Sequence, residues 1–280
     1  MNEIDPAALD KLISHALEED FGAGDITTRA VVPPGLKANG EFVAKEDLVL
    51  AGWPIAARTF HWMSAEITSH CFFSEGDTVS HGSILGRISG PASSLLSGER
   101  VALNFLQRMS GVATLTRKFV SAVSGFKTSI LDTRKTTPGL RLLEKYAVRM
   151  GGGKNHRFGL ADGVLIKDNH IAAAGSLIDA VRRAQLGVDH LKKIEVEVTN
   201  LEELAEALRA GADVILLDNM KVEEIKKAVV MVDGKVPLEV SGGVTLENVR
   251  EFAATGVDYI SIGALTHSPK AVDISLELKL

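Results

Sequence analysis

The sequence predicts an α/β protein with two domains: a first α/β domain, and a second domain built as an incomplete (β/α) barrel. Residues 38–90 contain short apolar runs separated by glycine-containing turn signals, a pattern typical of β-strands. After residue 126, apolar strands alternate with helical stretches, which indicates a parallel sheet covered by helices. Six strands are expected, at residues 129–131, 164–166, 194–198, 214–217, 238–240 and 259–262.

In the first domain, one helix is expected before the strands in the sequence and another after them. Asp5 followed by Pro6 is typical of a helix start, and Gly22 predicts the end of that helix near Phe21. A long helix with one apolar face is expected from Ser97. We predict the domain boundary inside or just after this helix, giving a first domain over residues 1–110 and a barrel over residues 111–267.

The helices of the second domain carry their own start signals. Asn200 with Glu203 predicts a capping box, and Thr245 is a candidate N-cap. No Gly-x-Gly-x-x-Gly motif follows a strand, which disfavours a dinucleotide-binding sheet and favours the barrel.

Composition excludes several classes of protein. The 280-residue chain has a net charge of −5, whereas a general nucleic-acid binder is expected to be basic, so no nucleic acid is expected as a partner. A single cysteine permits no internal disulfide and no cysteine-based zinc site, which is typical of a reducing compartment. Neither a signal peptide nor an 18-residue apolar run is present. We therefore expect a soluble, cytoplasmic protein without a membrane partner.

Polar residues occur at the carboxyl end of every predicted barrel strand, which is where barrel enzymes place their chemistry. These residues, strand by strand, are Arg134 and Lys135, Lys167, Glu195 and Glu197, Asp218, Ser241, and His267. Six polar strand ends together predict an active site.

The charges indicate what this site binds. Residues 132–167 contain eight basic and three acidic residues, a net charge of +5 inside an acidic chain. A solvated helix face explains some of the cations, but not those at strand ends or beside glycines. A compact cluster of cations favours a small polyanion with carboxylates, phosphates or both.

Two further features suit a phosphorylated substrate. Glu197 and Asp218 end neighbouring strands, and paired carboxylates facing a polyphosphate suit Mg²⁺; a structural salt bridge is the alternative for each. Glycine-rich turns follow the last two strands, at Ser241-Gly242-Gly243 and at Gly263-Ala264. Such turns before helices offer backbone N–H groups to phosphate.

These residues resemble those of the quinolinate phosphoribosyltransferase family, the carboxylating nicotinate-nucleotide pyrophosphorylases. The motifs that carry the resemblance cover nearly the whole chain in order: residues 18–20, 24–28, 98–104, 132–139, 151–157, 166–170 and 216–219. The resemblance implies an N-terminal α/β sandwich-like domain, an open α/β barrel of seven strands of the type II phosphoribosyltransferase kind, and a tail at residues 268–280 that returns to the first domain. It also implies a homo-oligomer, either a dimer or a hexamer.

The resemblance assigns roles to individual positions. Those expected to hold the two carboxylates of quinolinate are Arg134, His156, Arg157 and Lys167, with Arg100 contributed by the partner subunit. Those expected to serve phosphoribosyl diphosphate and its Mg²⁺ are Lys135, Glu197 and Asp218. Those expected at the 5-phosphate end are Ser241, Gly242, Gly263 and His267.

The implied reaction joins quinolinate to 5-phosphoribosyl 1-diphosphate and yields nicotinate mononucleotide, diphosphate and CO₂ on the route to NAD. Lys135 and Mg²⁺ are expected to stabilise the leaving diphosphate, and Glu197 the sugar cation. Two alternatives stay open at this point. One is a related phosphoribosyltransferase for another acidic ring, such as nicotinate; the other is a non-catalytic barrel that binds a phosphorylated metabolite.

Overall fold

The computed structural model describes residues 5–279, which divide into two compact units. The first unit contains residues up to Leu115, together with Thr137–Gly152 and the segment from Ser268 onward. The second contains Thr116–Thr136 and Gly153–His267. Among the described residues, no helix is long and apolar enough to cross a membrane.

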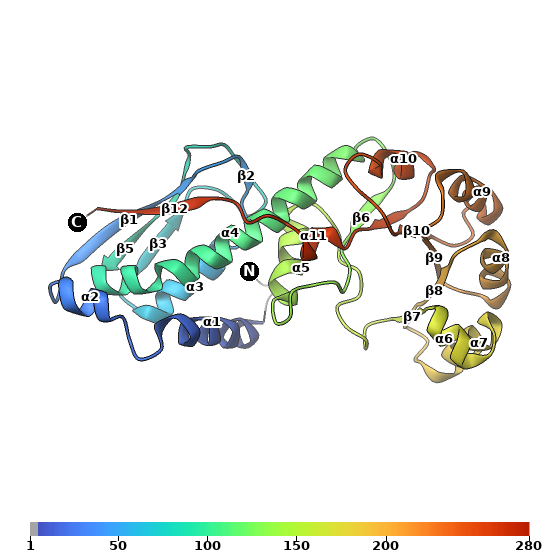
Figure 1. The fold of residues 1–280 in the computed structure, drawn as a ribbon, viewed down its shortest axis with the longest axis horizontal. Coiled ribbons are helices and arrows are strands. Elements are labelled where there is room, and N and C mark those ends of the chain that lie inside the picture. The colour runs from blue at the N-terminus through green and yellow to red at the C-terminus, as the bar shows by residue number, and fades with distance from the viewer. Residues whose placement is uncertain (1–4, 280) are drawn as a thin grey trace. The chain divides into compact units, whose positions relative to one another are not determined.

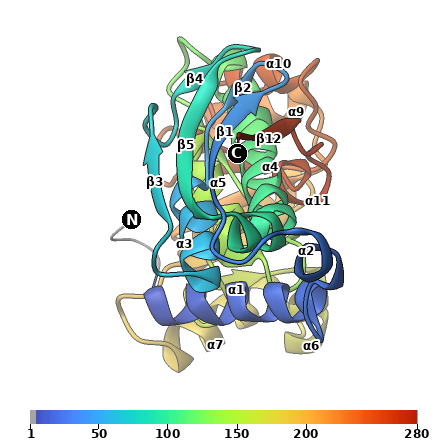
Figure 2. The same cartoon turned by 90° about the vertical axis from the view of Figure 1, so that its left-hand side faces the viewer.

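A four-stranded antiparallel sheet organises the first unit, in the order β12-β1-β5-β3 (Figure 2). The strands of this unit are β1 (Lys37–Ala44), β2 (Leu48–Val49), β3 (Thr68–Cys71), β4 (Thr78–Val79), β5 (Ile84–Pro91) and β12 (Ile274–Lys279). Its helices are α1 (Pro6–Phe21), α2 (Ile26–Val31), α3 (Trp53–Met63), α5 (Arg141–Met150) and the first part of α4 (Ala92–Ala122). The core contains Phe42, whose ring meets those of Trp53 and Phe60 edge-on.

The start of α1 follows from its sequence. The Asp5 carboxylate accepts hydrogen bonds from the N–H groups of Ala7 and Ala8, and Pro6 occupies the first turn, so the predicted cap is confirmed. The long helix α4 begins at Ala92, five residues before the predicted start, and continues from the first unit into the second.

A six-stranded parallel sheet organises the second unit, in the order β6-β11-β10-β9-β8-β7. All six predicted strands are confirmed, as β6 (Ser129–Leu131), β7 (Val164–Ile166), β8 (Ile194–Val198), β9 (Val214–Asp218), β10 (Leu238–Ser241) and β11 (Tyr259–Ser261). The helices are α6 (Asp168–Ala174), α7 (Leu177–Gly187), α8 (Leu201–Ala210), α9 (Val222–Val232), α10 (Val249–Ala254) and α11 (Ala264–His267). Figure 1 shows α8 and α9 on the outer side of β8 to β10.

The sheet is open between β6 and β7, because these strands stand at the two ends of its order. A single parallel bridge joins Leu131 of β6 to Lys154. The segment around Lys154 therefore occupies the seventh strand position that the family resemblance implies, without forming a strand of its own.

Two cap predictions fare differently. The Asn200 side chain accepts from the Glu203 N–H as predicted, but the Glu203 carboxylate accepts from the Thr199 N–H and so does not complete the box. The prediction of Thr245 as an N-cap is wrong. Asn248 precedes α10, and its side chain accepts from the Thr245 N–H in a turn before the helix.

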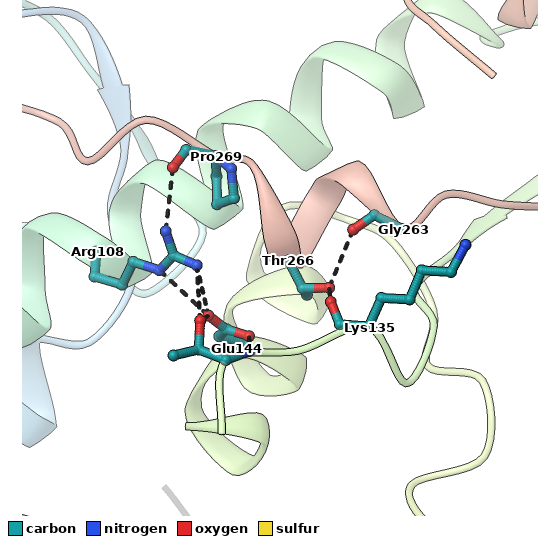
Figure 3. A network of polar contacts seen from close by, with 7 residues as sticks. Arg108, Lys135, Glu144, Gly263, Thr266 and Pro269 are labelled. Carbon is teal, nitrogen blue, oxygen red and sulfur yellow. Dashed lines mark hydrogen bonds and ion pairs between the residues drawn. The ribbon is translucent and has the colours of Figure 1, made fainter. Parts of the chain in front are cut away.

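The division into units differs from the predicted limits because Thr137–Gly152 belongs to the first unit. Glu144 of α5 is buried, and its carboxylate accepts from the Arg108 guanidinium and from both the N–H and the hydroxyl of Thr137. Arg108 also donates to the carbonyl of Pro269 (Figure 3). These contacts join α4, α5 and the C-terminal segment in one network, which the alternating strand-and-helix pattern does not reveal.

Candidate active site

A cavity of about 620 Å³ opens at the carboxyl ends of the parallel strands, and all its walls belong to the second unit. Alternate residues of each strand face it, because successive side chains of a strand point to opposite sides. A deeper row consists of Leu165, Leu216, Glu239 and Ser261, and an outer row of Lys167, Glu197, Asp218 and Ser241. Thr133, Arg134, Lys135, His156, Arg157, Asn219, Gly242 and Gly243 complete the lining.

Four cations face this cavity, as the sequence predicts. Arg134 and Lys135 follow β6, Lys167 follows β7, and Arg157 lies between these strands in the sequence. Arg157 donates to the carbonyl of Gly163 through Nη1, while its buried Nε has no hydrogen-bond partner. Burial, and next the charge of Arg134, lower the pKa of Arg157. A bound anion would therefore stabilise the charged form of this guanidinium. The unpartnered Nε–H can donate a hydrogen bond to that anion.

Two carboxylates lie on the neighbouring strands β8 and β9. Glu197 accepts a charged hydrogen bond from Lys167 at 2.5 Å, and Asp218 accepts from the Asn219 side chain at 2.7 Å. Pairing along the sheet sets Glu197 beside Leu216 and Asp218 beside Ser241. The predicted acids are therefore brought to one wall of the cavity, where carboxylate oxygens suit a hard divalent cation.

The turn after β10 requires glycine. Gly242 has φ +92°, and a Cβ built on it lies 2.1 Å from Oδ1 of Asn219. Any side chain at this position displaces Asn219 from Asp218. Ser241, Gly242 and Gly243 thus line the cavity together, as predicted.

The turn after β11 contacts Lys135 rather than the cavity itself. A Cβ on Gly263 lies 2.9 Å from Cδ of Lys135 and 3.1 Å from the ring of His267. The Thr266 hydroxyl donates to the carbonyl of Lys135 at 2.9 Å (Figure 3). Gly263 therefore lies against both the Lys135 side chain and the His267 ring, while Ala264 begins α11 outside the lining residues.

Arg100 is the one predicted cation that this cavity lacks. It lies on α4 in the first unit and is exposed, and it is not among the residues that line the cavity.

A buried acidic pair lies beneath the cations, and only part of it was predicted. Glu195 and Glu239 are 8% and 2% exposed, and each has an Oε1 atom without a hydrogen-bond partner. His156 Nε2 lies 3.0 Å from Glu195 Oε2 and 3.8 Å from Glu239 Oε1. Burial, and next the charge of Glu195, raise the pKa of Glu239 to about 7. The signal for Glu239 was an acid between two apolar residues of a buried strand.

Asp132 anchors the segment that carries His156. It is fully buried, and its carboxylate accepts from the Asn155 side chain at 2.7 Å and from the His156 N–H at 2.8 Å. The Asp132 carboxylate thus holds this segment through hydrogen bonds, which explains why an acidic residue begins a cationic loop.

Comparison with known proteins identifies close relatives along the whole chain. The family models described as quinolinate phosphoribosyl transferase, N-terminal and C-terminal domain, match residues 25–110 and 112–277. A probable nicotinate-nucleotide pyrophosphorylase (carboxylating) of Bacillus subtilis is 46% identical over 97% of this chain and 94% of its own length. Another, from Synechocystis, is 44% identical over 96% of this chain and 92% of its own. The crystal structure of NadC from Streptococcus pyogenes superposes with a TM-score of 0.95 at 42% identity, covering 99% of this chain and 98% of that one.

Proposed function

Because the chain belongs to the quinolinate phosphoribosyltransferase family, we propose that it transfers phosphoribosyl from 5-phosphoribosyl 1-diphosphate to quinolinate. The products are nicotinate mononucleotide, diphosphate and CO₂, a step of NAD biosynthesis. The observation that carries this proposal is one cavity with cations on one wall and paired carboxylates with a glycine turn on the other. A dicarboxylate and a phosphorylated sugar need these two walls together.

Quinolinate binds at the cationic wall. Its two carboxylates need several donors, and Arg134, Arg157 and Lys167 face the same space. The unpartnered Nε–H of Arg157 gives one carboxylate a buried donor. His156 lies at the floor of this wall, and Arg100 joins from the partner subunit of a homo-oligomer, in agreement with the family pattern.

Phosphoribosyl diphosphate binds along the turns after β10 and β11. Lys135 reaches its diphosphate, and the backbone N–H groups around Ser241, Gly242 and Gly243 receive the 5-phosphate. Gly263, Ala264 and His267 complete this end, and Gly263 lies against both the Lys135 side chain and the His267 ring.

The acids of the opposite wall fit Mg²⁺. Glu197 and Asp218 present carboxylate oxygens from adjacent strands, a donor set that suits this ion when substrate oxygens supply the rest. When bound, the ion neutralises charge on the diphosphate. Lys167 pairs with Glu197 in the present structure, so binding of quinolinate by Lys167 frees this carboxylate.

The side chains then assist one reaction, the displacement of diphosphate by quinolinate. The pyridine nitrogen attacks the anomeric carbon of the ribosyl group, the C–O bond to diphosphate breaks, and Lys135 stabilises the departing negative charge. The Glu197 carboxylate stabilises the cationic sugar in this proposal. The ring nitrogen becomes positively charged, so the adjacent C–C bond breaks, CO₂ leaves, and the electron pair on the ring carbon takes a proton.

Comparison of quinolinate with nicotinate as substrates tests this proposal. An enzyme built for two carboxylates leaves one cation of this wall unpaired with nicotinate, which costs about 2–4 kcal/mol in transition-state binding. The kcat/KM for quinolinate is therefore expected to exceed that for nicotinate by roughly 30-fold or more. Equal values for the two acids would show that the family's dicarboxylate specificity is not that of this chain.

A further inference from the structure

The floor of the cavity holds a cluster that superficially resembles a metal site. His156, Glu195 and Glu239 come from three different segments, and their ligand atoms all lie within 4.8 Å of one another. Two carboxylates and an imidazole are common ligands of divalent metals. The protonation of the imidazole decides whether this cluster can bind one.

The hydrogen bonds of the ring fix its tautomer. The backbone N–H of Arg157 points at Nδ1 of His156, with 2.8 Å between the nitrogens. A backbone N–H can only donate, so Nδ1 carries a lone pair and no proton. The proton of the neutral ring is then on Nε2, which donates to Glu195 Oε2 at 3.0 Å. Neither nitrogen is left to bind a metal or to donate to a substrate carboxylate.

The Glu195 carboxylate, 3.0 Å from Nε2, favours a proton on this nitrogen, and the Arg157 N–H at Nδ1 distinguishes the neutral ring from the charged one. Glu195 of β8 and Glu239 of β10 face Nε2, Asp132 contacts the His156 backbone, and Arg157 follows it in the chain. Burial, and next the charge of Glu195, raise the pKa of Glu239 to about 7, so this acid is partly protonated near neutral pH. Glu195 in turn favours the charged form of Arg157.

The ring therefore connects two parts of the site. On one side, the segment of residues 154–157 is held to β6 by the bridge at Lys154 and by the Asp132 carboxylate. On the other side, Glu195 belongs to β8. His156 closes the link between them through the peptide that carries Arg157.

We propose that His156 is a positioning residue, whose neutral imidazole fixes the Arg157 peptide against Glu195 and supplies no charge to the substrate. The role given to Arg157 rests on the proposed function. The positive charge of the quinolinate wall then comes from its arginines and lysines alone.

Nitrogen NMR of the histidine rings tests the tautomer without any assay of activity. The protein is labelled with ¹⁵N at its eight histidines, and His156 is assigned by the signals that the His156→Asn variant lacks. We expect a neutral ring protonated at Nε2 throughout the range from about pH 6 to 8. A ring protonated at Nδ1, or one that takes up a second proton within this range, overturns the proposal.

Kinetics of two variants test the positioning role. His156→Asn places an amide oxygen near Nδ1 and keeps the acceptor for Arg157, whereas His156→Ala removes it; His70→Asn, on the exposed end of β3, is the control. We expect His156→Ala to raise the KM for quinolinate about ten-fold or more, with His156→Asn recovering much of that loss and the KM for phosphoribosyl diphosphate unchanged. If His156 instead bound quinolinate as a cation, the wild-type KM would rise with pH through the histidine range, and both variants would lose that dependence equally.

The two tests separate the possible failures. If the enzyme forms nicotinate mononucleotide but the NMR shows another tautomer of His156, the inference about His156 is contradicted and the proposed function is not. The predicted tautomer in a protein that forms no such product contradicts the proposed function alone. If neither variant folds, the wild-type spectrum and the pH dependence of the wild-type KM still decide the inference.

Discussion

Arg157 is half-buried in the wall of the cavity, and we propose that it contributes to the choice of substrate. Its Nη1 donates to the carbonyl of Gly163, and its Nε is buried without a partner. Burial, and next the charge of Arg134, lower its pKa. An uncompensated donor of this kind is costly in the free protein and becomes favourable when an anion arrives. A bound carboxylate supplies the acceptor that the Nε–H of Arg157 lacks, so we propose that this donor favours carboxylate substrates.

The Arg157→Lys substitution keeps one positive charge but removes the planar fork and its Nε–H. We expect the KM for quinolinate to rise about ten-fold or more, with a much smaller change in the KM for phosphoribosyl diphosphate. Steady-state kinetics with each substrate varied in turn measure this. Arg209→Lys, on the exposed face of α8, controls for the exchange itself. Equal changes in both KM values would mean that Arg157 has no special relation to quinolinate.

Glu239 gives a prediction for the pH dependence of stability. Its pKa is raised from 4.5 to about 7 in the folded protein, so the folded state keeps a proton that the unfolded chain releases. This contribution to stability is fully present below about pH 4.5, falls as pH rises to about 7, and changes no further above that. Glu239→Gln cannot ionise, so its unfolding free energy relative to wild type should improve over this window, by at most about 3 kcal/mol. Urea unfolding at several pH values measures it, and a constant difference between the two proteins would contradict the assignment.

Among the elements, α4 is joined to α5 and to the C-terminal segment by Arg108, which donates to the buried carboxylate of Glu144 and to the carbonyl of Pro269. Arg108 donates to this carboxylate at 2.7 Å, and the Thr137 N–H at 3.0 Å. Thr137 lies two residues after Lys135, so the same network fixes the end of the loop that brings two cations to the cavity. A local contact inside the first unit thereby supports the loop that serves the second.

Arg108→Met should destabilise the protein by about 2–4 kcal/mol, because it leaves Glu144 buried without its cation. The partial exposure of Arg108 keeps the expected loss below that of a fully buried pair. Arg87→Met breaks the exposed pair with Glu41 and should cost much less. Denaturant unfolding of both variants provides the comparison. A similar loss of unfolding free energy in the two variants would show that the Glu144 network stabilises the protein no more than an exposed ion pair does.

Elements with a strong local signal could be predicted from the sequence, and those defined by distant partners could not. The six parallel strands and the cap of α1 follow from periodicity and from Asp5-Pro6. Thr245 was misassigned because a turn held by Asn248 precedes α10, and a turn and a cap use the same residue types. Glu239 and the Arg108–Glu144 network depend on contacts between residues far apart in the chain. No local pattern marks such pairs.

For the whole molecule, the resemblance to the family implies that Arg100 serves the active site of a second subunit. Arg100 is exposed on α4, and the lining of the cavity in one chain does not include it. We propose that the active unit is at least a dimer with two equivalent sites, each completed by its neighbour.

Complementation between two inactive variants tests this arrangement. Arg100→Ala and Arg134→Ala should each fold and each be inactive, while a mixture should regain activity because some mixed dimers carry one intact site. Exchange of subunits is first verified by mass spectrometry of tagged chains. Verified exchange without any return of activity would show that Arg100 acts within its own subunit.

The most direct test of the account is the product balance of the reaction. Quinolinate labelled in the carboxylate beside the ring nitrogen is incubated with 5-phosphoribosyl 1-diphosphate and Mg²⁺, with a control that lacks the phosphoribosyl donor. We expect labelled CO₂ and nicotinate mononucleotide in equal amounts, and neither product in the control. Transfer of phosphoribosyl without release of CO₂, or release of CO₂ without the donor, would contradict the reaction assigned to this cavity.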